Sequence, residues 1–137
     1  MRKFQFCRLV TFITVAAFSF LNVNAQIICR AVNLQTEHLI NPIGIDAAQP
    51  RLSWQLDDGR NGAKQTAYQI MIGTDSEKFI TWDSKKINSA VQFVTYAAKS
   101  LQSFTKYYWV VKIWDKDGRE SSSAIASFET GMMEMAN

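Results

Sequence analysis

The chain has 137 residues, 47% of them hydrophobic and 20% charged, with fifteen Lys and Arg against twelve Asp and Glu. Three of the basic residues (Arg2, Lys3 and Arg8) lie at the very start, so the rest of the chain carries twelve charges of each sign. The basic excess is therefore no evidence for nucleic-acid binding, which needs a clustered basic surface, and we expect no nucleic-acid partner. The length allows one hydrophobic core, not a large catalytic barrel.

The first 25 residues have the layout of a secretory signal peptide. A basic start precedes the mostly apolar stretch 9–21, and the small-residue sequence Val23-Asn24-Ala25 follows it. The apolar stretch is short for a membrane span. We therefore expect cleavage after Ala25, export to the periplasm or the exterior, and no membrane span after cleavage. The alternative is an uncleaved N-terminal anchor.

The two cysteines cannot form an internal disulfide in the exported chain. Cys7 belongs to the expected signal peptide, which leaves Cys29 alone. A lipoprotein anchor at Cys29 would need small residues before it, and Ile27 and Ile28 stand there instead. An exported domain without a disulfide depends on its core for stability. We expect Cys29 to be buried or simply unpaired, the alternative being a reactive thiol.

The sequence of the first half of the domain predicts three strands separated by polar turns. Segment 27–39 alternates weakly and predicts an edge strand, and the breaker cluster 41–46 predicts a bend. Segments 52–56 and 65–72 give clear two-residue alternation, with the turn 57–62 between them. The residues on the alternating faces are Val32, Leu34 and Thr36, then Leu52, Trp54 and Leu56, then Tyr68, Ile70 and Ile72.

The second half continues the same pattern. Segment 79–82 is either a short strand or a loop carrying aromatic residues, and 91–96 is rich in β-branched and aromatic residues. A long aromatic strand begins near residue 106, and 115–118 predicts a hairpin turn. The last strand, 123–130, places Ala124, Ala126 and Phe128 on one face and Ile125 and Ser127 on the other.

The aromatic strand decides the fold class. Tyr107, Trp109, Val111 and Ile113 share one face, and Leu101 with Tyr107 stands where a sandwich places its tyrosine corner. We predict an all-β fold, a seven-stranded immunoglobulin or fibronectin-type-III-like β-sandwich. It is expected over 26–131, with 132–137 as a stub of a missing downstream region. The predicted structural core contains Trp54, Tyr107 and Trp109.

Five sequence motifs, taken in order, resemble one family. They look like the N-terminal fibronectin-type-III-like (immunoglobulin-like) domain of bacterial α-L-rhamnosidases of glycoside hydrolase family 78. The motifs are EHLINPIGID at 37–46 with PRLSW at 50–54, QTAYQI at 65–70, WDS at 82–84, YYWVVKIWDKDG at 107–118 and FETG at 128–131.

The resemblance implies a role without catalysis. In that family this domain precedes a carbohydrate-binding-like β-domain and an (α/α)6 barrel, which carries the catalytic carboxylates of an inverting hydrolysis. No part of this chain matches the barrel, so no catalytic residue is carried over. The resemblance implies a spacer or bracing module of an exported α-L-rhamnosidase-like enzyme. The partners of this module would be the downstream domains. The substrates of the whole enzyme would be rhamnose-containing glycans.

The polar residues do not form a catalytic or metal-binding pattern. His38 is the only histidine, and we expect it at the surface or partly packed. The motif at Asp115 resembles the start of a calcium loop, but Ala126 stands where the twelfth-position Glu is required. Asp57 and Asp58 are adjacent on a turn, so we expect solvated carboxylates and not a hydrolytic pair. We predict no catalytic residue, cofactor or metal.

Three aromatic residues lie off the predicted core face and are candidates for contact with another molecule. They are Trp82, Tyr108 and Trp114. Packing against a neighbouring domain is one hypothesis and direct glycan contact is another. The chain is thus either an accessory module of a larger enzyme or an independent secreted glycan- or protein-binding β-sandwich. A stand-alone enzyme is disfavoured because no nucleophile is paired with a base.

Overall fold

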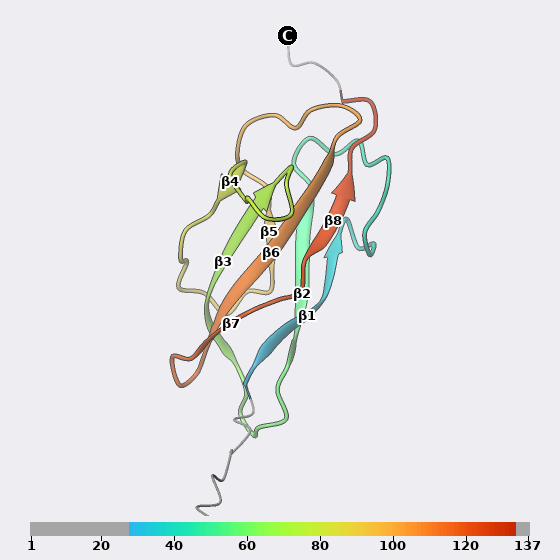
Figure 1. Cartoon of the computed structure of the whole chain (residues 1–137). Coiled ribbons are helices and arrows are strands. Elements are labelled where there is room, and N and C mark those ends of the chain that lie inside the picture. The colour runs from blue at the N-terminus through green and yellow to red at the C-terminus, as the bar shows by residue number, and fades with distance from the viewer. Residues whose placement is uncertain (1–27, 134–137) are drawn as a thin grey trace, which may run out of the picture.

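The computed structural model describes residues 28–133, which form two antiparallel sheets packed face to face (Figure 1). The predicted signal peptide, 1–25, lies outside the described residues. Within them, no helix is long and apolar enough to cross a membrane. The first sheet has the order β1 (Arg30–Thr36), β2 (Arg51–Asp57) and β5 (Phe93–Thr95). The second has the order β4 (Trp82–Asp83), β3 (Gln65–Gly73), β6 (Lys106–Asp115) and β7 (Glu120–Ser122), with β8 (Ala126–Glu129) also paired to β6.

Strands β7 and β8 are one strand interrupted by a bulge. Lys112 pairs with Ser122, but Trp109 pairs with Ala126, so the β7–β8 side holds one extra residue. Ser123 closes the break, because its N–H donates to the Val111 carbonyl and its hydroxyl accepts from the Val111 N–H, at 2.9 and 3.0 Å. Counting this pair as one strand gives seven strands, which confirms the predicted all-β sandwich.

The core lies between the sheets, and β6 contributes most to it. The four inward side chains of β6 are buried; β3 beside it in the same sheet adds three buried side chains, and β2 in the opposite sheet adds two. Trp54 meets Tyr68 edge-on, and Tyr107 stacks on Phe128, with ring centroids 5.3 Å apart in both pairs. The inward residues are Tyr107, Trp109, Val111 and Ile113 of β6, Tyr68, Ile70 and Ile72 of β3, and Leu52 and Trp54 of β2.

A buried glutamine joins three segments of the sandwich. The Trp54 indole N–H donates to Gln65 Oε1 at 2.8 Å, and the Gln65 amide donates to the carbonyls of Ser89 and Val91 at 3.0 and 2.9 Å. Gln65 is almost fully buried. Because a buried amide without partners is costly, these three bonds explain how a polar residue occupies the core. They fasten β2 and β3 to the connection between β4 and β5.

Strand β1 departs from its predicted alternation. Val32, expected to share a face with Leu34, is 37% exposed, whereas Ala31 and Leu34 are buried. The register against β2 shifts between Val32 and Gln35, and Asn33 has φ of 50°. This irregularity inserts an extra residue, so the side chain before it turns outward.

The predicted tyrosine corner is confirmed. The Tyr107 hydroxyl accepts the backbone N–H of Gln102 at 2.9 Å, and Leu101 beside it is buried. This bond fixes the segment that leads from the first sheet into β6.

Replacing Tyr107 with Phe should lower the free energy of unfolding by about 1–3 kcal/mol. The ring still fills the core, but the Gln102 N–H loses its partner. Urea denaturation of Tyr107→Phe against the parent chain measures the difference. Tyr108→Phe is the matched control, because Tyr108 lies on the outer face of the same strand, and it should leave the midpoint unchanged. Equal midpoints for all three chains would contradict the importance of the corner.

Candidate functional site

An arginine holds three carboxylates together at one end of the sandwich. Arg60 contacts Asp58 at 2.6 Å, Asp115 at 2.7 Å and Asp117 at 2.8 Å. Asp115 also accepts the backbone N–H groups of Asp117 and Arg119, both at 2.9 Å. The cluster therefore ties the turn after β2 to the hairpin after β6.

Asp58 corrects a prediction from the sequence. It was expected as a solvated turn residue together with Asp57, but its side chain and that of Asp115 are each only 1% exposed. The cause is Arg60, which folds back over the turn and bonds Asp58 through two nitrogens. Asp57 is exposed as expected.

Arg60 stabilises the ionised forms of Asp58 and Asp115. Hydrogen bonding to Arg60 holds the pKa of the Asp58 carboxyl well below its usual range, and the same residue lowers the pKa of Asp115 against the opposing effect of burial. The two carboxylates in turn raise the pKa of Arg60. Both acids are thus ionised at neutral pH and hold no proton to donate, which makes the cluster a structural clamp.

The predicted hairpin at Asp115–Gly118 is confirmed. The Gly118 N–H donates to the Asp115 carbonyl at 3.0 Å, and Gly118 has φ of 76°. The Asp115 side chain points into the Arg60 clamp, which leaves it no freedom to act as a calcium ligand. Among residues 28–133, no group of three or more His, Cys, Asp and Glu is placed to hold a metal ion.

Cys29 is buried and unpaired, as the sequence predicted. Burial, together with the nearby Asp58 carboxylate, raises the pKa of the Cys29 thiol to about 11. A thiol with such a pKa is protonated at neutral pH and is a poor nucleophile. The solitary His38 is exposed, beside a shallow hollow of about 240 Å³ that Arg51, Ser53 and Phe93 also line.

Two of the three candidate contact aromatics lie on the outer face of the second sheet. Tyr108 and Trp114 are both half-buried on β6. They are six residues apart, which is about 20 Å along a strand, so they do not form one platform. Lys86 Nζ lies 4.2 Å from the centre of the Trp114 ring, and Lys106 Nζ lies 5.5 Å from that of Tyr108. Lysine therefore occupies the ring surface that a sugar would need on Trp114.

Trp82 lies apart from the other two and differs from its expected placement off the core. It pairs with Ile72 of β3, which puts it on the inward side, and it packs against the core as a half-buried residue. Its ring meets Tyr96 edge-on with centroids 5.2 Å apart. The contact role predicted for Trp82, Tyr108 and Trp114 stays a prediction, whereas Trp54, Tyr107 and Trp109 are all buried in the core.

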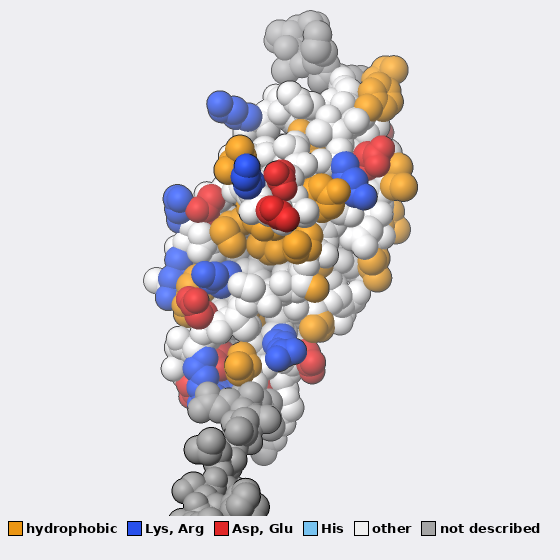
Figure 2. All heavy atoms as spheres, viewed as in Figure 1, with side chains coloured by type: hydrophobic (Ala, Val, Ile, Leu, Met, Phe, Trp, Pro, Cys, Tyr) orange, Lys and Arg blue, Asp and Glu red, His pale blue; other side chains and the backbone are white. Residues whose placement is uncertain are grey.

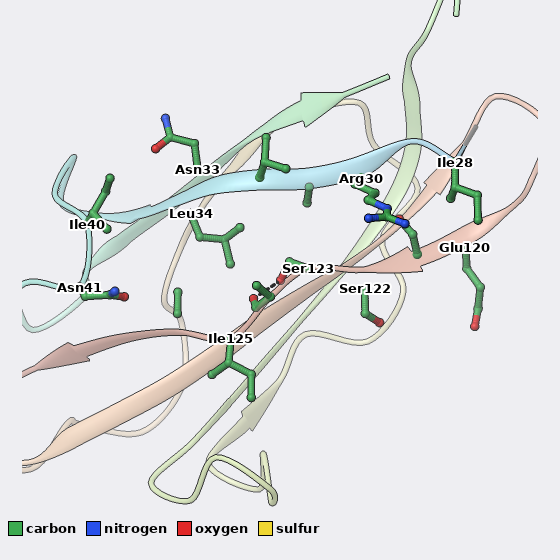
Figure 3. A pocket seen from close by; sticks show the side chains of 15 residues that line it. Ile28, Arg30, Asn33, Leu34, Ile40, Asn41, Glu120, Ser122, Ser123 and Ile125 are labelled. Atoms are coloured by element: carbon green, nitrogen blue, oxygen red, sulfur yellow. Dashed lines mark hydrogen bonds between the residues drawn. The ribbon is translucent and has the colours of Figure 1, made fainter. Parts of the chain in front are cut away.

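A groove that sequence reasoning missed runs between the two sheets where β1 faces β7 and β8 (Figure 3). It has a volume of about 660 Å³. Its ends are fastened by side chains, because Ser121 Oγ donates to the Cys29 carbonyl at 2.6 Å and Asn41 Oδ1 accepts the Ser127 N–H at 2.9 Å. Both sides mix apolar and polar residues, with Ile40 and Asn33 on one and Ile125 and Ser122 on the other. The groove exists only because the packing of the two sheets brings the edge strand β1 opposite β7 and β8.

Residues 31–134 match a family described as the Rha78A-like, N-terminal immunoglobulin domain. The chain belongs to this family. It is 38% identical over 109 residues to an α-L-rhamnosidase of Streptomyces avermitilis, and 36% identical over 104 residues to one of Formosa agariphila. These matches cover 76% and 71% of this chain but only 11% of either relative.

A solved structure extends the likeness to three dimensions. The S. avermitilis α-L-rhamnosidase complexed with L-rhamnose superimposes with a TM-score of 0.73 at 36% identity, over 76% of this chain and 11% of that one. The chain thus corresponds to about one ninth of the rhamnosidases that it resembles. The family membership agrees with the resemblance predicted from the five sequence motifs.

Replacing Arg60 with Gln should destabilise the chain strongly at pH 7 and less in acid. In the parent chain the pKa values of Asp58 and Asp115 are lowered. The stabilisation from their pairing with Arg60 is therefore fully present above about pH 4 and is lost as the pH falls further. In Arg60→Gln both carboxylates are left without their cation at pH 7, and protonation in acid removes that penalty. Thermal unfolding at pH 7 and pH 3.5 should show the gap between the two chains narrowing on acidification.

The control for Arg60→Gln is Arg51→Gln. Arg51 pairs with Glu37 at 3.1 Å, but its side chain is mostly exposed, so its loss should have little effect on the unfolding temperature. Equal effects of the two substitutions at pH 7 would contradict the clamp.

Proposed function

We propose that the chain is a non-catalytic N-terminal accessory module, which spaces and braces the downstream domains of an exported α-L-rhamnosidase-like enzyme. The observation that carries this proposal is the match of residues 31–134 to the N-terminal immunoglobulin domain family. The relatives named above are α-L-rhamnosidases about nine times longer than the matched segment. The substrates of the enzyme would be rhamnose-containing glycans.

The chemistry of the described residues supports a role without catalysis. Inverting glycoside hydrolysis needs one carboxyl group that keeps its proton near neutral pH and a second, ionised one about 6.5–9.5 Å away. Asp58 and Asp115 are the buried carboxylates that come together here, and Arg60 lowers the pKa of both. They are thus unsuited to protonating a glycosidic oxygen.

Export of the module is also a proposal, and it rests on the signal-like segment 1–25. The fold is compatible with an oxidising compartment, because its one cysteine within 28–133 is buried and its stability comes from an aromatic core. Purification of the protein from its source and sequencing of its N-terminus tests this part. A first residue near Gln26 would support export, and retention of Arg2 would count against cleavage.

The purified chain should not hydrolyse 4-nitrophenyl α-L-rhamnoside, whereas a longer product of the same gene should. The first step is to read the coding DNA beyond the codon for Asn137. A frame that continues into several hundred further residues provides the longer protein, and release of nitrophenol by both proteins is then compared. Hydrolysis by the chain alone would overturn the proposal, and so would a verified stop codon after Asn137.

A second candidate function is that of an independent glycan- or protein-binding module, and the groove along β1 favours it. Its mixed lining could contact both hydroxyl groups and the apolar faces of a sugar ring. Titration of the ¹⁵N-labelled chain with millimolar L-rhamnose should then shift the amide signals of Asn33, Asn41 and Ser122. Shifts should be absent at Asp83 on β4, which forms the edge of the second sheet opposite to β7. Unchanged signals at all four positions would exclude binding of rhamnose in the groove at these concentrations.

A further inference from the structure

The two ends of the sandwich have opposite surface character. At one end, the turns 57–63 and 115–119 carry the Arg60 clamp, and none of their residues is a large exposed hydrophobic one. At the other end, where the described chain finishes, hydrophobic side chains are exposed close to Met133 (Figure 2). We call this second region the exit end and define it by residues 42–45, 80, 102–105 and 129–133.

Backbone hydrogen bonds make the exit end a single fixed surface. Gly44 and Ile45 donate to the Glu129 carbonyl at 2.8 and 3.0 Å, and Gly131 donates to the Ile45 carbonyl at 2.7 Å. Phe104 donates in turn to the Gly131 carbonyl at 3.0 Å. Three segments that are far apart in the sequence therefore lie side by side at the top of Figure 1.

The last described residues are part of this surface. The Met133 N–H donates to Ser103 Oγ at 2.9 Å, and the Met133 side chain is buried against the core. The described chain is thus held to the sandwich up to its last residue, Met133.

The apolar residues of the exit end point outward. Ile43 is 79% exposed, Phe104 70% and Met132 75%. Phe104 also has φ of 51°, a backbone conformation that bulky residues rarely adopt. Ile80, 85% exposed, borders a hollow of about 610 Å³ that Thr81, Ala98 and Gln102 also line. An aromatic side chain held outward on a strained backbone, beside other apolar groups, is a feature of contact surfaces and not of a solvated tip.

We propose that the exit end is the docking surface for the domain that follows Met133 in the longer protein. This inference rests on the proposed accessory function. The occupant is identified by position, because a domain joined at Met133 is tethered to this surface and meets it at a high effective concentration. The matched segment is 11% of each relative named above, so a protein of that length would have further chain to cover the exit end. The face that meets Ile43, Phe104 and Met132 would be apolar, since these three side chains offer no charge to pair, and Glu129 is the charged residue of the exit end.

The outer face of β6 is a weaker surface for this role. Lys86 and Lys112 lie over its aromatic residue Trp114, and Lys106 lies over Tyr108. Desolvating these ammonium groups in an interface would be costly. The exit end has no such cost at Ile43, Phe104 and Met132.

Hydrogen exchange in the longer protein tests the inference directly. Exchange is measured by mass spectrometry on that protein and on the 137-residue chain. Peptides covering 42–45, 102–105 and 129–133 should exchange at least about tenfold more slowly in the longer protein, because docking buries them. Peptides covering 57–63 and 115–119 should exchange equally in both.

A double variant separates docking from folding. Phe104→Ser with Met132→Ser should leave the unfolding temperature of the 137-residue chain within about 4 °C of the parent, because both side chains are exposed. In the longer protein the same variant should lose the extra protection at the exit end. Phe93→Ser is the matched control, since Phe93 is also exposed but lies on β5, and it should keep that protection.

The outcomes distinguish this inference from the proposed function. Equal exchange at the exit end in an active longer rhamnosidase would overturn the docking surface alone. Protection that persists in the double variant would overturn the role of Phe104 and Met132. Hydrolysis by the short chain, or a stop codon after Asn137, would overturn the accessory function and the inference together.

Discussion

The structure depends on β6, which is the one strand paired along both edges for most of its length. β3 lies on one side of it and the bulged β7–β8 strand on the other, while Tyr107, Trp109, Val111 and Ile113 fill the space between the sheets. A displacement of β6 by one residue would turn all four of these side chains to solvent. The tyrosine corner opposes such a slip, because it fixes the start of the strand to Gln102.

Polar residues stabilise this sandwich in ways that also remove their chemical reactivity. The Gln65 side chain makes its three hydrogen bonds within the sandwich, and Arg60 forms ion pairs with the carboxylates that the turns bring together. Two buried groups are exceptions, since the Thr36 hydroxyl and the Trp109 indole N–H have no hydrogen-bond partner within residues 28–133. The Gln65 hydrogen bonds and the Arg60 ion pairs hold strands and turns in place. A domain built in this way is suited to positioning other parts of a protein.

The two ends of the sandwich differ in surface character, and this difference indicates which end contacts the rest of a longer protein. The end with the Arg60 clamp is polar, and its ion pairs are satisfied within the chain, whereas the exit end presents Ile43, Phe104 and Met132 to solvent. Membership of the N-terminal immunoglobulin domain family and the proposed docking at Met133 fit one picture. In it, a stiff module meets its neighbour through the surface nearest to the point where the chain continues. The groove along β1 remains free for the alternative binding role.

The sequence by itself determined the fold class, most strand positions and the core, because alternation along a strand is a local property that burial enforces. It failed where distant residues act together. The Arg60 clamp, the Gln65 network and the inward placement of Trp82 depend on pairings between segments that no local pattern records, and Val32 turned outward because of a bulge at Asn33. The groove and the exit end likewise exist only once the sheets have packed, since each is assembled from segments that the fold brings side by side.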